Sequence, residues 1–166
     1  AASGCLVIAK KRSVLRALHE QLRQKTMKKQ YVALVRGQWD KKDRLVKEPL
    51  LKIPQVSVVK VSPLGKASET HFKIIQRYQG ATLVEASPIT GRTHQIRVHA
   101  ACKGHNIACD ERYGNKEFDS SMKSLGLNRL FLHAAHITFF HPGLEKKMTM
   151  TAPLCPRLEE LLTKLE

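Results

Sequence analysis

The sequence predicts an α+β fold, with a mainly antiparallel mixed sheet and flanking helices. Strand-like and helix-like segments follow in the order strand, helix, strands, helix, strands, helix, and short turns join several strands. The chain has 166 residues, of which 42% are hydrophobic, so it can bury the core of one domain. We therefore treat residues 1–166 as a single folded unit.

The first elements are a strand, a helix and a second strand. Residues 5–9 form a short apolar run that predicts a buried strand. Ser13 is the expected N-cap of the helix that follows. The apolar stripe of this helix consists of leucines at helical spacing: Leu15, Leu18 and Leu22. After a basic connector, residues 31–35 predict a second strand that ends at Gly37.

The next stretch predicts irregular structure and then a hairpin. A charged loop at 40–47 precedes a proline-interrupted stretch, in which residues 56–61 can form one edge strand. Residues 68–78 and 81–87 predict the two arms of a hairpin joined across a Gln-Gly turn.

The hairpin leads into the most polar segment of the chain, residues 91–99, with the sequence Gly-Arg-Thr-His-Gln-Ile-Arg-Val-His. A turn at 90–91 precedes a helix that Thr93 would cap and that would run to Lys103, with Gly104 as its stop. A helix N-terminus beside an arginine can bind an anion, here an RNA phosphate or an enzyme carboxylate. From charge alone, a solvated basic helix end is the simpler interpretation.

The C-terminal part predicts a loop, two helices and two strands. Residues 104–114 form the loop and 118–127 a weak helix. Residues 130–140 and 147–152 predict strands split by a His-Pro-Gly turn. Pro156 opens the last helix. Its apolar stripe is Leu158, Leu161, Leu162 and Leu165.

The charge balance points to a polyanionic partner. Lysine and arginine number 29 against 14 aspartates and glutamates, which gives a net charge of +15. Nucleic acid explains this excess better than a membrane surface, and no apolar run is long enough to cross a bilayer. The four cysteines are scattered, which is typical of reduced thiols in a cytoplasmic protein. We expect a cytoplasmic monomer.

The sequence argues against a metal centre and a nucleotide cofactor. Four potential ligands fall in one window: His99, Cys102, His105 and Cys109. A structural zinc usually takes two ligand pairs from separate knuckles, whereas here one pair lies on a helix and the other follows a glycine stop. The chain has no Gly-x-Ser-x-Gly, His-Glu-x-x-His or glycine-rich phosphate motif.

Aromatic residues are few, and most fall in apolar strands. We expect four of them in the core: Phe72, Phe131, Phe139 and Phe140. Tyr31 differs because it follows basic residues at the start of a strand, and Tyr113 lies in a polar loop. Either tyrosine can pack its ring and expose its hydroxyl, or stack on a base.

Four motifs resemble those of the RluA-type pseudouridine synthases, in the family's order: 29–37 (the tyrosine motif), 91–99, 110–114 and 129–134 (the leucine motif). The resemblance runs from Ser3 to the end of the chain and implies the family's catalytic fold. Residues 13–20 and 34–39 are most similar to members that modify large-subunit (23S) ribosomal RNA.

The resemblance implies isomerisation of uridine to pseudouridine in that RNA, without a cofactor. Tyr31 would stack on the target base and could remove its C5 proton, Leu132 would pack on the uracil, and Arg92 would hold the nucleophilic aspartate. The remaining substrate-binding candidates are Thr93, His94, Gln95 and Arg97. Phosphate-binding candidates are Lys10, Lys11, Arg12, Lys28 and Lys29.

The chain departs from the family pattern at its start. The family's aspartate lies in a His-Arg-Leu-Asp motif a few residues before a Ser-Gly, which here is Ser3-Gly4. We therefore expect the aspartate to precede Ala1, and residues 1–166 to be the C-terminal part of a catalytic domain that is inactive alone. Asn106 replaces a usual proline, and Asp110 matches a different family position. The alternative is a non-catalytic RNA- or ribosome-binding module, which the charge fits equally well.

Overall fold

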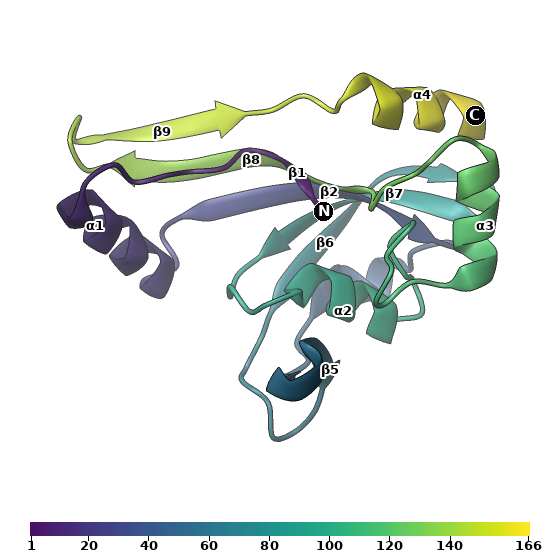
Figure 1. Ribbon diagram of the computed structural model, residues 1–166, viewed down its shortest axis with the longest axis horizontal. Helices are drawn as coiled ribbons and strands as arrows, with labels where there is room; N and C mark the ends of the chain where they lie inside the picture. The colour runs from purple at the N-terminus through teal and green to yellow at the C-terminus, as the bar shows by residue number, and fades with distance from the viewer.

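The computed structural model describes residues 1–166 and contains one large sheet and one small one (Figure 1). The strands of the large sheet are β1 (Ser3–Gly4), β2 (Lys28–Arg36), β3 (Leu45–Val46), β6 (Thr70–Tyr78), β7 (Ala81–Pro88), β8 (Leu132–His141) and β9 (Lys146–Thr151). Their order is β1-β8-β2-β7-β6-β3, and β9 also pairs with β8. Only β1 runs parallel to its neighbour, so the predicted mainly antiparallel mixed sheet is confirmed.

The small sheet and the helices surround the large sheet. The small sheet pairs β4 (Leu50–Ile53) with β5 (Val58–Val61). The α-helices are α1 (Arg12–Arg23), α2 (Gln95–Cys102), α3 (Lys116–Ser124) and α4 (Pro156–Leu165). Short 3₁₀ turns occur at η1 (Lys41–Arg44) and η2 (Pro54–Val56). The longest helix has 12 residues, and none is long and apolar enough to cross a membrane.

Two cores lie on opposite faces of the large sheet, because successive strand residues point to opposite sides. On one face, Ala33 and Val35 of β2 pack with Ile96 of α2. On the other face, Leu34 packs with residues of α3 and α4, including Leu158. Figure 1 shows α2 below the sheet and α3 and α4 together at its right end. The face that carries α2 also carries the pocket described below.

A third, smaller core fixes α1 to the far ends of β8 and β9. Leu18 of α1 packs with Ile137 and Phe139. The Gln21 side chain donates to the Phe140 carbonyl (2.7 Å) and accepts from its N–H (2.9 Å). In Figure 1 this part projects to the left, away from α3 and α4. We call it the α1 arm and define it as residues 10–29 and 138–151.

The prediction of a buried strand at 5–9 is wrong. Cys5, Val7 and Ala9 face the small core, but Leu6 and Ile8 are 81% and 76% exposed. Only Ser3 and Gly4 pair with β8, because β9 occupies the same edge of β8 from His136 onwards. The apolar run is therefore extended but has no free strand edge to join.

Two predicted helix caps and one core residue also differ. α1 begins at Arg12 after Lys11, so Ser13 lies inside the helix. The N-cap of α2 is His94, in a left-handed conformation with φ 54°, and Thr93 lies outside the helix. Phe140 is 49% exposed because it faces away from α1, whereas the other three predicted core phenylalanines are buried.

The hairpin and the last helix are confirmed. β6 and β7 pair from Tyr78 and Ala81 to Thr70 and Pro88, close to the predicted arms. α4 begins at Pro156 and buries Leu158 and Leu161 against the sheet. The β6–β7 register is interrupted only by an irregularity between Ile74 and Gln76.

Candidate active site

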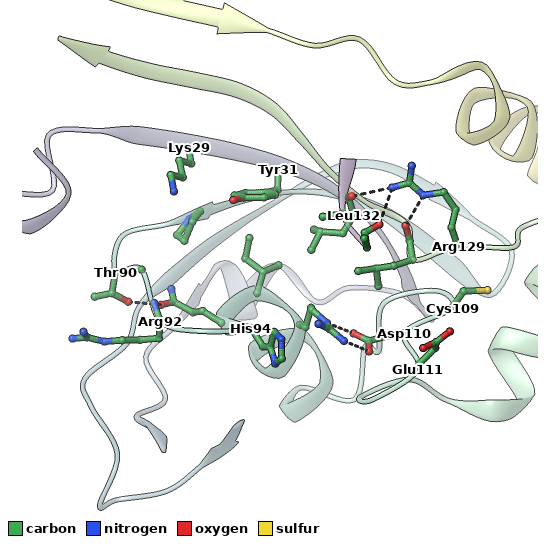
Figure 2. Close-up of a pocket in the computed structure, with 18 of the residues that line it drawn as sticks. Lys29, Tyr31, Thr90, Arg92, His94, Cys109, Asp110, Glu111, Arg129 and Leu132 are labelled. Carbon is green, nitrogen blue, oxygen red and sulfur yellow. Dashed lines mark hydrogen bonds and ion pairs between the residues drawn. The ribbon is translucent and has the colours of Figure 1, made fainter. Parts of the chain in front are cut away.

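A pocket of about 960 Å³ opens on the α2 face of the sheet (Figure 2). Its walls come from segments far apart in the sequence: the first half of β2, the turn at 88–94, the first turn of α2, the C-terminal end of α1, the loop at 109–111, part of α3 and the segment 128–132. Ala1 and Ala2 also line it. The pocket therefore forms only where the sheet, three helices and their connecting loops meet.

Cations outnumber carboxylates in the walls of this pocket. Seven lysines and arginines line it: Arg23, Lys25, Lys29, Arg92, Arg97, Lys123 and Arg129. Three carboxylates line it: Asp110, Glu111 and Asp119. This excess of positive charge favours an anionic ligand such as the phosphates of a nucleic acid.

Tyr31 and Leu132 lie on neighbouring strands in the upper part of the pocket in Figure 2. Tyr31 is half-buried, and its hydroxyl makes no hydrogen bond within the protein. Because no buried side-chain oxygen or nitrogen lacks a partner, this hydroxyl must reach open space. Burial raises the pKa of Tyr31, so the neutral phenol is favoured.

Arg97 and Asp110 form the most enclosed ion pair of the protein. Arg97 Nε and Nη2 each donate to a different oxygen of Asp110 at 2.7 Å (Figure 2). The side chains of Arg97 and Asp110 are 17% and 1% exposed. Arg97 also lies 5.0 Å from the centre of the Tyr113 ring. Its remaining nitrogen, Nη1, has no partner and must therefore be accessible.

Asp110 is almost completely buried, and its carboxylate accepts four hydrogen bonds from its own protein. Besides the two bonds from Arg97, it accepts from the N–H groups of Arg112 and Tyr113, both at 3.0 Å. Burial alone would raise the pKa of Asp110, but the hydrogen bonds from Arg97, Tyr113 and Arg112 lower it. This carboxylate is built to orient Arg97.

Arg92 lies at the rim of the pocket and is exposed. Its Nε and Nη2 both donate to the Ala67 carbonyl at 3.2 Å. In Figure 2 its side chain extends sideways, away from Tyr31 and Leu132. The two arginines of the 91–99 segment thus occupy different positions, with Arg92 on the rim and Arg97 against buried Asp110.

Gln95 is buried, and all of its hydrogen-bonding positions are used. Its Oε1 accepts from the Thr90 hydroxyl (2.6 Å) and from the Arg92 N–H (3.1 Å). Its Nε2 donates to the Glu69 carbonyl (2.8 Å) and to Thr70 Oγ1 (2.9 Å). Gln95 therefore holds the turn before α2 against the start of β6, with no polar atom left for a substrate.

His94 and Thr93 complete the turn. His94 Nδ1 lies 2.8 Å from the Tyr113 hydroxyl, which also accepts from the Val59 N–H at 3.0 Å. Burial lowers the pKa of His94, and the nearby charges of Arg97 and Arg112 lower it further. His94 lines the pocket, whereas Thr93 is exposed outside it.

The other predicted residues are divided between the pocket and the α1 arm. Lys29 lines the pocket on the same strand as Tyr31, whereas Lys10, Lys11, Arg12 and Lys28 are exposed beyond it.

The four potential metal ligands do not converge, and no group of three histidine, cysteine, aspartate or glutamate side chains is placed to hold a metal ion. His99 instead bonds to Thr70 Oγ1 and the Glu48 carbonyl.

Arg129 is a pocket residue that the sequence reasoning missed. Its Nη2 donates to Ser3 Oγ at 2.9 Å, and Ser3 Oγ lies 2.8 Å from His133 Nδ1. Arg129 thereby ties β1 to the segment that precedes β8. The only sequence signal was its position at the start of the leucine motif. Lys123 and Asp119, on α3, gave no signal at all.

Comparison with known proteins identifies close relatives. Ribosomal large subunit pseudouridine synthase C of Haemophilus ducreyi is 58% identical over 166 residues, covering 98% of this chain and 52% of that protein. Proteins of the same name from Vibrio cholerae and Escherichia coli are each 55% identical, covering 98% of this chain and 52% and 53% of theirs. The chain thus spans about half the length of the curated relatives it matches.

Solved structures and a family model agree with this similarity. Human RNA Pseudouridylate Synthase Domain Containing 1 and 4 each match with a TM-score of 0.75 and 21% identity, covering 92% and 93% of this chain and 66% and 68% of theirs. At that identity the likeness establishes the fold. A family model described as RNA pseudouridylate synthase matches residues 1–102. Because that match covers more than half of the chain, this protein belongs to the RNA pseudouridylate synthase family.

Proposed function

We propose that this protein isomerises uridine to pseudouridine in large-subunit (23S) ribosomal RNA, without a cofactor and as a cytoplasmic monomer. The observation that carries the proposal is the basic pocket, where the open polar groups of Tyr31 and Arg97 lie in the same cavity as apolar Leu132. A flipped nucleotide needs such a combination of flat apolar surface, polar contacts and cations for its phosphate. The names of the relatives supply the RNA class.

The proposed reaction is a rearrangement with no net change of atoms or electrons. The bond from N1 of uracil to C1′ of the ribose breaks, the base turns, and a bond from C5 to C1′ forms. C5 loses a proton and N1 gains one. Tyr31 would stack on the base and Leu132 would pack against it. Because burial favours the neutral phenol, removal of the C5 proton by Tyr31 would first require its ionisation.

Arg97 rather than Arg92 is our candidate for the cation that orients the nucleophile. Arg97 is already held in a fixed plane by Asp110, and its Nη1 is free to donate to a second carboxylate. Arg92, which the sequence resemblance favoured, is exposed and bonds only to a main-chain carbonyl through its guanidinium. We assign Arg92 to a phosphate of the RNA, with Thr93 and His94 as neighbouring RNA contacts.

The nucleophilic aspartate is expected N-terminal to Ala1. Of the three carboxylates that line the pocket, Asp110 is paired with Arg97, Asp119 accepts from the Cys109 N–H at 2.7 Å, and Glu111 is exposed and makes no ion pair with a pocket cation. Ala1 and Ala2 lie in the pocket wall, so residues joined to Ala1 would start beside Arg129 and Leu132.

Release of tritium from ribosomal RNA labelled at C5 of uridine tests this function. We expect release by the form that carries the residues encoded upstream of Ala1, and none by residues 1–166 alone, in preparations free of host synthases. Turnover by residues 1–166 would refute the upstream nucleophile. Absence of turnover in both forms, with RNA binding retained, would favour a non-catalytic RNA- or ribosome-binding module.

RNA binding by residues 1–166 should weaken steeply with salt. Each phosphate neutralised on a single strand contributes about 0.7 to the slope of log affinity against log salt. With a net charge of +15, we expect several such contacts. Fluorescence anisotropy of a single-stranded RNA at increasing salt measures the slope, and an affinity independent of salt would contradict RNA binding through charge.

A further inference from the structure

The positive charge of the protein is concentrated in the α1 arm. Its 34 residues contain ten lysines and arginines and only two glutamates, a net charge of +8. The other 132 residues carry +7. More than half of the net charge therefore lies in about a fifth of the chain. Much of it lies outside the pocket, which among these residues includes only Arg23, Lys25 and Lys29 as cations.

On α1 this charge forms one stripe. Residues 12, 16, 19 and 23 are separated by four, three and four positions, so they lie within about 60° of one another around the helix. They are Arg12, Arg16, His19 and Arg23, and all four are exposed. The stripe is about 16 Å long, at 1.5 Å per residue. Leu18, which faces the small core, lies on another side of the helix.

The two outer arginines of the stripe are unpaired. No ion pair of the protein includes Arg12 or Arg16. Arg23, at the inner end, pairs with Glu20. Exposed cations without a carboxylate partner are available to phosphates, so the outer part of the stripe is open to an external anion.

The stripe is continuous with the pocket. Leu22 and Arg23, in the last turn of α1, line the pocket, and the connector adds Lys25 and Lys29. A strand whose nucleotide enters the pocket can therefore meet Arg23 first, then Arg16 and Arg12. Leu15 and Leu22 are 43% and 44% exposed next to the stripe, which offers apolar surface to bases.

We propose that α1 is the docking surface for the single-stranded RNA that flanks the target uridine on one side. The proposal rests on the proposed function for the identity of the ligand in the pocket. The phosphates of the flanking nucleotides lie along Arg12, Arg16 and His19, and such contacts add affinity without reading sequence. The strand on the other side of the target uridine leaves the pocket without touching α1.

The test uses residues 1–166 and three RNAs. One is a short single strand centred on a uridine, and the other two extend it by about 6 nucleotides on the 5′ or the 3′ side. The unmodified protein should bind one of the two extended RNAs more tightly than the short RNA, because that extension contacts α1. The double variant Arg12→Gln/Arg16→Gln should bind that extended RNA roughly tenfold more weakly at low salt. The slope of log affinity against log salt for the same RNA should decrease by about 1.4. Binding of the short RNA should stay within about twofold.

The matched control is Lys60→Gln/Lys73→Gln, which removes the same charge from exposed positions on β5 and β6 outside the pocket. If both double variants weaken all three RNAs equally, net charge alone explains binding and the proposal is wrong. If neither extension depends on Arg12 and Arg16, it is also wrong. Failure to form pseudouridine would remove the proposed function but leave this result readable, because the test measures binding without turnover.

Discussion

Replacing Arg97 by lysine should reduce the single-turnover rate of the form extended upstream of Ala1 by roughly a hundredfold. Lysine keeps the charge but loses the planar fork, which here uses Nε and Nη2 for Asp110 and leaves Nη1 for a second carboxylate. Losing one aimed contact to a reacting group costs about 3 kcal/mol of barrier. Rapid-quench measurement of tritium release at saturating enzyme gives the rate directly.

Arg92→Ala is the comparison that makes this result decisive. We expect it to weaken RNA binding and lower the salt slope by about 0.7, with saturated turnover preserved, because an exposed rim arginine contributes one phosphate contact. If the hundredfold loss falls on Arg92→Ala and not on Arg97→Lys, the assignment of the two arginines must be exchanged. Circular dichroism on each variant checks that it is folded at the assay temperature.

Replacing Asp110 by asparagine should lower the free energy of unfolding by about 3 kcal/mol near pH 7. Removing one partner of a buried ion pair typically costs 3–5 kcal/mol, and Arg97 keeps some access to the pocket, which favours the lower end. Urea unfolding of residues 1–166 measures the change. In a double-mutant cycle with Arg97→Met, the double variant should lose much less free energy of unfolding than the sum of the losses in the two single variants.

The loss should depend on pH in one direction. Because folding lowers the pKa of Asp110, the ionised carboxylate stabilises the protein above the unfolded pKa of about 4, and this stabilisation disappears as the pH falls through the folded pKa. The difference in free energy of unfolding between the unmodified protein and Asp110→Asn should therefore have its full value at pH 6 and become smaller below about pH 4. Asp119→Asn is the control, because burial raises the pKa of Asp119 and its only hydrogen bond can be kept by an amide. If Asp110→Asn and Asp119→Asn lose the same free energy of unfolding, the ion pair of Asp110 with Arg97 does not stabilise the protein in the way expected.

Local patterns were sufficient for the elements that carry their own signals. The hairpin has two strand-like segments around a Gln-Gly turn, and the last helix begins at a proline and has a leucine stripe, so each could be predicted without knowledge of its neighbours. Residues 5–9 show the limit of such reasoning. Their continuous apolar run is typical of a buried strand, but whether they pair depends on β9, which takes the available edge of β8.

The candidate site also shows what local motifs can predict and what depends on contacts between distant parts of the chain. The resemblance located the segment 91–99 and Tyr31 and Leu132, all of which contribute to the pocket. It could not distinguish Arg92 from Arg97, because that depends on where α2 begins. Since the helix starts at Gln95, Arg92 lies in the preceding turn, while Arg97 lies in the first helical turn against Asp110. Arg129 was missed because its partner, Ser3, is 126 positions away.

The parallel pairing of β1 with β8 sets the order in which the molecule can be assembled during translation. Ser3 and Gly4 pair with His133 and Ala134, so β1 has no partner until His133 and Ala134 have left the ribosome. At about 10 residues per second, this interval is roughly 13 s. β2, β6 and β7 can pair earlier, since they are close in sequence. The pocket, which is lined by both Ala1 and Leu132, is therefore completed only after Leu132 has been made.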